Sequence, residues 1–322
     1  MPKKIKIPPA KYPLLLIYNL IGAMFSQDHR IAGRLMQYFG TYRSFAGELL
    51  NQLSRYARSP KSFLPQGILI EPTNLCNLKC GHCSTQRNNE PRGLMDLEFY
   101  KSIIDANPQI TCIILSRYGE PFLHPKILDM IAYAKKRNIY VSTYTNGILL
   151  SREKADGVIS NGLDEIIFSL EGIGDRYEKN RGTPYGALKE NMEYLIERRD
   201  RSLSGIRIGI NVARIADGDD YIEMVKKEWQ GKVDNIDVEP LIGNKYKARE
   251  TACRTLWRNA VIRWDGIVFP CCVDMDSTLP IGDLKKNSLK EIFNGDKAVS
   301  LRKSHIEKRY PPVCRYCDAF FG

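Results

Sequence analysis

Short apolar runs alternate with longer amphipathic segments through most of this chain. Runs of four to eight apolar residues bounded by polar ones predict β-strands, and they lie at about 68–72, 111–115, 139–143, 165–170, 206–212 and 234–240. Segments with apolar residues every three or four positions predict helices, and they lie near 96–106, 125–137, 151–161, 184–200 and 219–230. Asp96, a candidate N-cap, precedes the first of them.

This alternation predicts six βα units and hence an α/β fold with a parallel sheet and right-handed crossovers. Ligand sites of such sheets lie at the carboxyl ends of the strands. The polar motifs described below all follow predicted strands directly, so we expect them to share one edge of the sheet.

Three cysteines, Cys76, Cys80 and Cys83, follow the first predicted strand in the run CNLKCGHC. Four thiolates saturate a 4Fe-4S cluster, whereas three can hold three irons and leave the fourth open, as catalytic metal sites do. A zinc site with His82 or His124 as fourth ligand, or a set of buried structural thiols, are the alternatives from spacing alone.

The cysteine spacing resembles that of the radical S-adenosylmethionine (SAM) enzymes. In that family the open iron is chelated by the amino and carboxylate groups of SAM. The segment LSRYGEPFLHP is similar to the Gly-Gly-Glu-Pro motif that meets the SAM amino group, with Tyr118 in place of the first Gly, followed by Gly119, Glu120 and Pro121. The resemblance implies that these four residues bind SAM.

Two later segments extend the resemblance. YVSTYTNG is similar to the family's third strand and contains Asn146, and IIFSLEG is similar to its fourth, with Ser169 and with Glu171 where Asp is usual. Tyr177 and Arg181 then stand at the family's offsets for a Tyr and an Arg. The resemblance implies that Asn146, Ser169, Glu171 and Arg181 contribute to the SAM site, Arg181 near the SAM carboxylate.

A second cysteine set begins after residue 245, where the βα rhythm stops. Cys253, then Gly266 and Cys271, then the pair Cys314 and Cys317 resemble the auxiliary-cluster domain called SPASM in its shortened twitch form. The resemblance implies one closed 4Fe-4S cluster held by these four cysteines. A structural zinc site is the alternative.

Two cysteines remain outside both sets. Cys272 could exchange roles with Cys271, but the Gly-x4-Cys offset favours Cys271. Cys112 lies within a predicted strand and is interpreted as a small buried hydrophobe. No signal peptide is recognised, so we expect free thiols in the reducing cytoplasm rather than disulfides.

The resemblance therefore implies a partial (β/α)6 radical SAM barrel with extensions at both ends. We predict a basic amphipathic helical extension over 1–66, the barrel over 67–245 and a SPASM/twitch domain over 246–322.

The net charge of +11 is concentrated near the N-terminus, where residues 1–61 hold ten Lys or Arg against two acidic residues. The apolar run 12–25 is too short to span a bilayer. Apolar residues then recur at helical spacing over 31–56, which predicts either packing on the outer wall of the barrel or peripheral contact with the inner membrane face. No nucleic-acid partner is expected, because no recognition motif accompanies the charge.

The resemblance also implies that the protein carries out the chemistry of the family. An electron from a donor such as flavodoxin or ferredoxin reduces the first cluster, SAM is cleaved, and a 5′-deoxyadenosyl radical takes hydrogen from a substrate. The cysteine set resembles that of a single-auxiliary-cluster dehydrogenase of aminocyclitol antibiotic biosynthesis, which favours net oxidation of a small molecule or sugar. Alternatives are peptide modification, a membrane-associated lipid or polyprenyl substrate, and a non-enzymatic zinc or iron–sulfur protein. The sequence identifies no catalytic acid or base.

Overall fold

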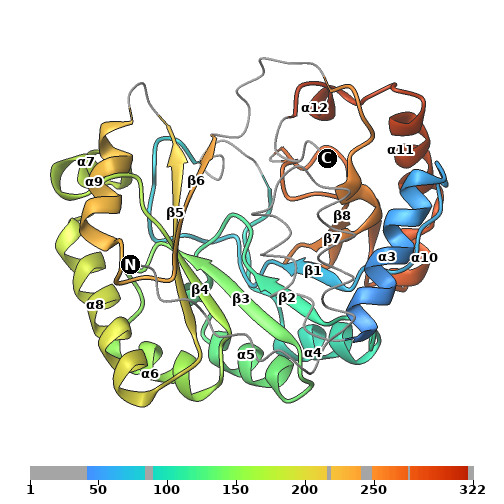
Figure 1. Ribbon diagram of the computed structural model, residues 1–322. Helices are drawn as coiled ribbons and strands as arrows, with labels where there is room; N and C mark the ends of the chain where they lie inside the picture. Colours follow the sequence, from blue (N-terminus) through green and yellow to red (C-terminus); the bar gives the residue numbers. More distant parts are fainter. Residues whose placement is uncertain (1–41, 84–89, 216–218, 241–248, 275, 318–322) are drawn as a thin grey trace, which may run out of the picture.

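A single mixed sheet runs through the protein, seen in a computed structural model that describes residues 42–83, 90–215, 219–240, 249–274 and 276–317. Its strand order is β6-β5-β4-β3-β2-β1-β7-β8-β9 (Figure 1). All neighbours from β6 to β1 are parallel, which confirms the predicted parallel α/β fold. These six strands are β1 (Gly67–Ile70), β2 (Cys112–Leu115), β3 (Tyr140–Thr145), β4 (Glu165–Ser169), β5 (Arg207–Arg214) and β6 (Asn235–Pro240).

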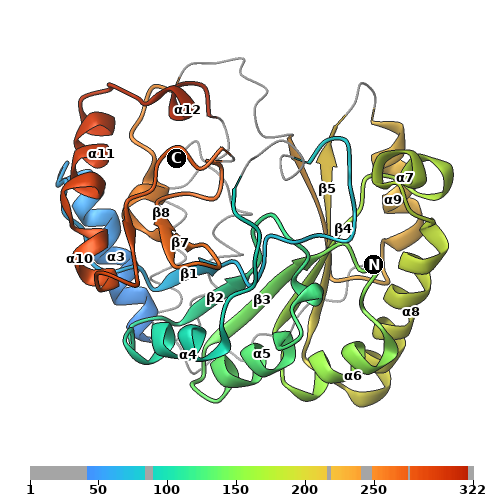
Figure 2. The same ribbon diagram turned by 180° about the vertical axis from the view of Figure 1, so that it is seen from behind.

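Helices cover one face of this parallel part, as the view from behind also shows (Figure 2). The Asp96 carboxylate accepts a hydrogen bond from the Phe99 amide at 2.8 Å and caps the first of them, as predicted. Each predicted strand and helix of the barrel begins and ends within two residues of its observed bounds. The helices are α4 (Leu97–Asp105), α5 (Ile127–Lys135), α6 (Arg152–Ser160), α7 (Gly174–Arg181), α8 (Tyr185–Ser202) and α9 (Asp220–Trp229).

Alternate residues of the strands build the core against the helices. Ile68 and Ile70 of β1 are buried with Ile113 and Leu115 of β2 in one hydrophobic cluster, together with Tyr100 of α4. The intervening positions carry their side chains to the opposite face of the sheet. This period of two leaves the inner face and the strand ends available for polar residues.

The sheet continues into the C-terminal region, which the sequence pattern did not predict. There β7 (Asn259–Ile262) lies parallel to β1, and β8 (Ile267–Phe269) and β9 (Gly282–Asp283) follow antiparallel. Gly266 makes the turn before β8 with φ +95°, a conformation that favours glycine. The remaining elements are the 3-10 helices η2 (Pro121–Leu123) and η3 (Arg254–Trp257) and the helices α10 (Leu289–Phe293), α11 (Asp296–Ile306) and α12 (Pro312–Arg315).

The described part of the N-terminal extension forms α3 (Tyr42–Tyr56), a helix as predicted. This helix contacts η3 of the C-terminal region, a neighbour that the sequence did not predict. The Trp257 indole donates to the Ser59 carbonyl at 2.8 Å, and Ser62 and Asn294 exchange two hydrogen bonds at 2.9 Å.

The apolar run 12–25 and the positions 31–41 of the predicted amphipathic helix lie outside the described residues. Within the described part of the chain, no helix combines the length and the apolar character that crossing a membrane requires.

Candidate functional site

The first three cysteines lie in the loop that leaves β1, at the edge where the carboxyl ends of β1 to β4 meet. Side chains from the end of β3 and from the end of α7 reach this loop. The side-chain amide nitrogen of Asn146, which follows β3, lies 2.9 Å from the Asn77 side-chain oxygen and 3.8 Å from the Cys76 sulfur. An Arg181 nitrogen, at the end of α7, lies 3.8 Å from the Cys80 sulfur. The structure thus brings predicted residues from three separate segments to one site.

Burial raises the pKa of the Cys76 thiol to about 11, and the neighbouring Glu120, Cys80 and Cys83 act in the same direction. Burial also raises the pKa of Cys80, which the nearby Arg181 partly offsets. A metal that binds cysteines displaces their thiol protons. This donor set fits an iron–sulfur cluster with one iron that the protein leaves unligated.

Gly119 is the point at which the loop after β2 touches the cysteine loop. A Cβ atom at this position would lie 2.1 Å from the Thr73 carbonyl oxygen and 2.7 Å from that of Leu75. The next amide, of Glu120, donates to the Leu75 carbonyl at 2.8 Å. Only glycine permits this approach, so residue 119 fixes the position of the cysteine loop against β2.

The Glu120 carboxylate is buried at the centre of the strand ends. One oxygen accepts hydrogen bonds from the Thr145 hydroxyl at 2.7 Å and the Phe122 amide at 3.1 Å, and the other accepts from the Asn146 amide at 2.8 Å. Burial raises the pKa of Glu120, against the effect of these donors. Glu120 therefore joins the ends of β2 and β3. Thr145 was not recognised from the sequence, although it precedes the predicted Asn146.

Glu171 and Arg181 form a buried ion pair beside Cys80. The Arg181 Nε donates to the Glu171 Oε2 at 2.5 Å, and His82 lies 3.8 Å from the same carboxylate oxygen. Burial lowers the pKa of His82. Tyr177 is buried on the same helix as Arg181, and Ser169 is half-buried at the end of β4, paired in register with Asn211. Whether these residues bind SAM stays a prediction.

Tyr118 points toward the C-terminal region. Its hydroxyl donates to the Cys272 carbonyl at 3.2 Å, and the Arg117 guanidinium lies between the Tyr118 ring, 4.2 Å away, and the Phe269 ring, 4.7 Å away. Pro121, which follows Glu120, opens η2 and is buried. Tyr118 thus connects the first cysteine site to the second.

A buried charge network, which sequence reasoning missed, lies beside this connection. Arg117 is 3.6 Å from Glu71, which follows β1, and 3.2 Å from Glu90, and it donates to the Ser277 hydroxyl at 2.6 Å. Glu90 also accepts from Arg263 at 3.0 Å. Burial raises the pKa of Glu71 to about 6. The available sequence signal for this network was Glu71, the charged residue that ends the apolar run in ILIEP.

The second cysteine set lines one cavity in the C-terminal region. All four predicted ligands contribute to its wall, and Cys272 does not. Apolar residues and the buried Asp274 complete the wall, and Asp274 holds its own loop through bonds from Thr278 and Leu279 at 2.7–2.9 Å. The predicted ligands on the cavity wall are Cys253, Cys271, Cys314 and Cys317.

Burial and neighbouring thiols raise the pKa values of two cysteines in this cavity. Burial raises the pKa of Cys314 to about 12, and Cys253 and Cys317 raise it further. A hydrogen bond with Cys272 and burial raise the pKa of Cys271. Within the described ranges, no group of three or more His, Cys, Asp or Glu side chains is arranged to hold a single metal ion. Four cysteines around one cavity are a donor set that suits a closed 4Fe-4S cluster.

Comparison with known proteins agrees with both sites. Residues 70–226 match the family model of the radical SAM superfamily, and residues 253–318 match that of SPASM, an iron–sulfur cluster-binding domain. Together these matches cover more than half of the chain. The protein belongs to the radical SAM superfamily and carries a C-terminal SPASM domain. Its cofactors are the radical SAM 4Fe-4S cluster, an auxiliary cluster and SAM.

Three relatives illustrate the range of the superfamily. The tungsten-containing aldehyde ferredoxin oxidoreductase cofactor-modifying protein of Pyrococcus furiosus is 24% identical, with 78% of this chain and 86% of the relative aligned. The structure of BtrN in complex with AdoMet and 2-DOIA superposes with TM-score 0.58 at 19% identity, over 80% of this chain and 94% of that chain. Streptococcus suis SuiB bound to precursor peptide SuiA gives TM-score 0.63 at 14% identity, over 82% and 72%. At these identities, the two structures show a shared fold.

Proposed function

We propose that this radical SAM enzyme carries out a net oxidation, a dehydrogenation, of a small molecule or sugar-like substrate. The observation that carries this proposal is the single cavity lined by Cys253, Cys271, Cys314 and Cys317. Four thiolates saturate a cluster and leave no iron open for a substrate atom. A closed cluster in that cavity is suited to accepting an electron, which a dehydrogenation requires and a redox-neutral reaction does not.

When bound, the first cluster and SAM supply a 5′-deoxyadenosyl radical that takes a hydrogen atom from a substrate C–H bond. We assign Cys76, Cys80 and Cys83 as the ligands of that cluster. Gly119 and the Glu120 amide hold the cysteine loop against β2, and the Glu120 carboxylate holds the end of β3. Through these contacts the protein positions the reacting groups and excludes water.

Conversion of an alcohol to a carbonyl then requires the loss of one proton and one further electron. The chain supports such a transfer by holding its two cysteine sites at a fixed separation. Tyr118 bonds to the Cys272 backbone, and Arg117 bonds to Ser277, so the end of β2 is tied directly to the auxiliary region. Loss of a hydrogen bond made by a charged group, such as that of Arg117, costs about 1.5–3 kcal/mol.

The likeness to BtrN supports a small substrate, because this chain covers 94% of that protein, whose structure contains 2-DOIA. Peptide modification is the second candidate, favoured by the likeness to SuiB bound to its precursor peptide. The domain boundaries 1–66, 67–245 and 246–322, and SAM contacts from Tyr118, Gly119, Glu120, Pro121, Asn146, Ser169, Glu171 and Arg181, are part of this proposal.

The variant Cys314→Ala tests the electron-acceptor role. Anaerobically reconstituted protein would be incubated with SAM, dithionite and candidate polyols, and products analysed by mass spectrometry. We expect the variant to release 5′-deoxyadenosine but to form little product lighter by two hydrogen atoms. Cys112→Ala is the matched control, because Cys112 is a buried thiol in β2 outside both sites, and it should form oxidised product.

Undiminished oxidised product from Cys314→Ala, with the second cluster absent, would contradict the proposal. Hydrogen exchange into a peptide but into no polyol would instead favour the second candidate.

A further inference from the structure

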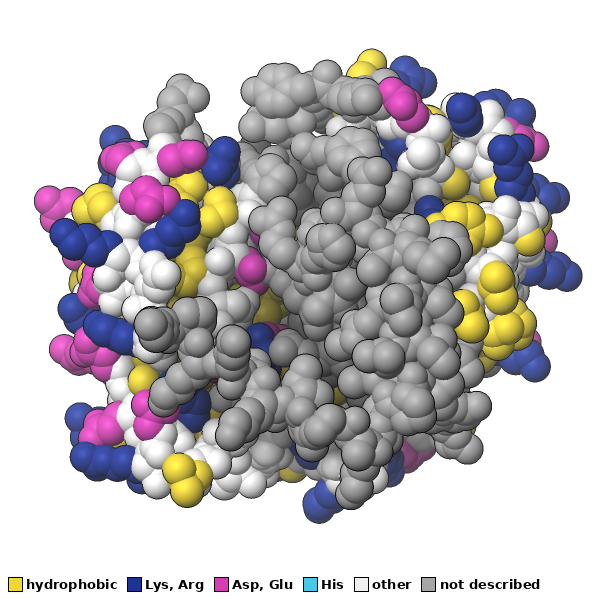
Figure 3. All heavy atoms as spheres, viewed as in Figure 1, with side chains coloured by type: hydrophobic (Ala, Val, Ile, Leu, Met, Phe, Trp, Pro, Cys, Tyr) yellow, Lys and Arg dark blue, Asp and Glu magenta, His cyan; other side chains and the backbone are white. Residues whose placement is uncertain are grey.

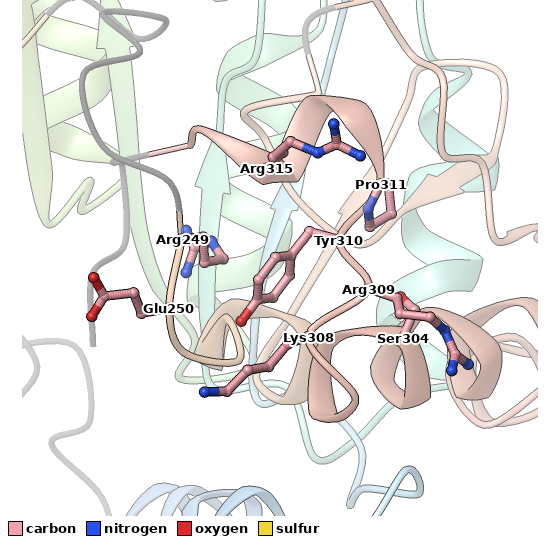
Figure 4. Close-up of a pocket in the computed structure, with 8 residues that line it drawn as sticks. All are labelled: Arg249, Glu250, Ser304, Lys308, Arg309, Tyr310, Pro311 and Arg315. Carbon is pink, nitrogen blue, oxygen red and sulfur yellow. The ribbon is translucent and has the colours of Figure 1, made fainter.

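A separate cavity of about 620 Å³ opens in the C-terminal region, away from the β-strands of the barrel. Its wall is formed by the C-terminal end of α11, the turn that follows it, α12, and residues 249–250 (Figure 4). This volume is in the range of small-molecule sites. Unlike most such sites, its lining is dominated by charged side chains.

Positive charge predominates in this cavity. Arg249, Lys308, Arg309 and Arg315 line it, against one lining carboxylate, Glu250. Arg309 also pairs with an exposed acidic neighbour in the sequence. Figure 3 shows Lys and Arg side chains gathered along the edge of the molecule formed by α11 and α12, whereas over α8 and α9 they alternate with Asp and Glu. Such a concentration favours a ligand with more than one negative charge.

Tyr310 adds a hydrogen-bond donor to the cavity. Its ring stands edge-on to His305 with centroids 5.0 Å apart, and its hydroxyl is buried with no hydrogen-bond partner in the described chain. Figure 4 shows this hydroxyl pointing between Arg249 and Lys308. The other lining hydroxyl, of Ser304, already donates to the Leu301 carbonyl at 2.8 Å. A buried hydroxyl without a hydrogen-bond partner destabilises the fold, and a bound anion that accepted a hydrogen bond from it would remove that cost.

Lys308 has a backbone conformation that a lysine adopts at a cost. It follows the end of α11 with φ +60°, and the Lys308 and Arg309 amides donate to the His305 and Ser304 carbonyls at 3.2 and 2.7 Å. This is the helix-ending motif in which glycine is usual. A cation near a helix C-terminus also favours the helix dipole, but glycine would serve the turn better.

Arg249 links this cavity to the auxiliary cluster site, because it lines both cavities. Its amide donates to the Arg315 carbonyl at 2.8 Å, and its guanidinium donates to the Cys317 carbonyl at 3.0 Å. A ligand in the basic cavity would therefore lie beside the Cys314–Cys317 segment.

We propose that this cavity is a binding site for a phosphate-bearing group. Guanidinium groups match phosphate oxygens in paired hydrogen bonds, and Figure 4 places the Lys308 ammonium and the Tyr310 hydroxyl on the same side of the cavity as Arg249, whereas Arg309 and Arg315 point to other sides. This site goes beyond the proposed oxidation and does not depend on it.

Calorimetric titration of the reconstituted full-length enzyme with inorganic phosphate, at constant ionic strength in a phosphate-free buffer, tests the site. We expect saturable binding that weakens at least tenfold in Lys308→Gly and less in Arg315→Ala, whose guanidinium points to another side of the cavity. Lys297→Ala, an exposed lysine in the first turn of α11 and outside the cavity lining, should bind as the wild type does.

Lys308→Gly also separates binding from folding. Because glycine accepts a positive φ without strain, this variant should melt at the same or a higher temperature while losing phosphate affinity. Absence of saturable binding, or equal affinities in Lys308→Gly and Lys297→Ala, would overturn the proposal.

A sedimentation assay distinguishes the two sources of such a group. Phosphatidylcholine vesicles with and without phosphatidic acid would be mixed with each variant. Sedimentation that requires phosphatidic acid and Lys308 would assign the phosphate to a lipid headgroup. Phosphate binding in solution without Lys308-dependent sedimentation would assign it to a soluble phosphate ester.

Discussion

The two cysteine sites differ in how the chain assembles them. Cys76, Cys80 and Cys83 come from one loop of eight residues and are held by polar contacts with the strand ends. The auxiliary set comes from three separate segments and surrounds a cavity with mainly apolar remaining walls. A short loop places three thiols on one side of a cluster and leaves the other side for a ligand. Distant segments can enclose a cluster completely.

This difference explains the distribution of charged side chains. The buried Glu120 and the ion pair of Glu171 with Arg181 lie at the first site, where we propose that SAM binds through its amino and carboxylate groups. The wall of the second site contains one arginine and one aspartate, Arg249 and Asp274, and both are committed to backbone groups. The first site is thus suited to reversible binding and the second to permanent retention.

The largest expected effect on the first site alone comes from Gly119→Ala. The added methyl group would meet two backbone carbonyls of the cysteine loop, and because backbone cannot easily move aside, the cost should lie near the upper end of the roughly 1–3 kcal/mol typical of overpacking. We expect a loss of SAM affinity of roughly 100-fold or more, measured by calorimetry, with the auxiliary cluster retained. Gly67→Ala is the control, because a Cβ there meets nothing within 4 Å. An unchanged SAM affinity in Gly119→Ala would show that this glycine does not position the SAM site.

A smaller effect is expected from Glu120→Gln. The amide would turn its NH2 group toward at least one of the three donors that the carboxylate now accepts from. Loss of a charge-assisted bond is worth about 1.5–3 kcal/mol, so SAM affinity should fall roughly 10- to 100-fold. Both clusters should remain by iron analysis. The exposed Glu98→Gln on α4 is the control, and equal affinities in the two variants would remove Glu120 from the site.

The smallest effect concerns Glu71, in the network that joins the two sites. Its folded-state pKa of about 6 lies above the ordinary value of 4.5, so the folded protein binds this proton more tightly than the unfolded chain does. The associated stability is present below pH 4.5 and is lost as pH rises through 6. Between pH 5 and pH 8 it amounts to about 1 kcal/mol. Anaerobic chemical denaturation should therefore show a flatter pH dependence in Glu71→Gln, and identical slopes would contradict this.

The barrel could be predicted from the sequence because its information is local. Apolar runs and helical periodicity fixed the strands and helices to within two residues, and the family motifs located the strand ends. Helix α7 was missed because its sequence GDRYEKNR has no apolar stripe. Strands β7 to β9 were missed because the first of them joins the sheet beside β1, about 190 residues earlier in the chain.

The sequence predicted which residues form the candidate site better than it predicted how they contact one another. The residues Cys76, Asn146, Glu171 and Arg181 were each named from short motifs, and the structure brings them together. The bonds of Glu120 and the Arg117 network depend on which strand ends become neighbours. A pattern along one chain does not contain that information.

Iron and sulfide analysis of anaerobically reconstituted protein tests the central claim most directly. The account predicts about eight irons and eight sulfides per chain, from one open and one closed 4Fe-4S cluster. Replacing Cys76, Cys80 and Cys83 together by Ala should leave about four of each and abolish 5′-deoxyadenosine release. Stoichiometric zinc in protein purified without air, or loss of all iron from the triple variant, would contradict the presence of two independent cluster sites.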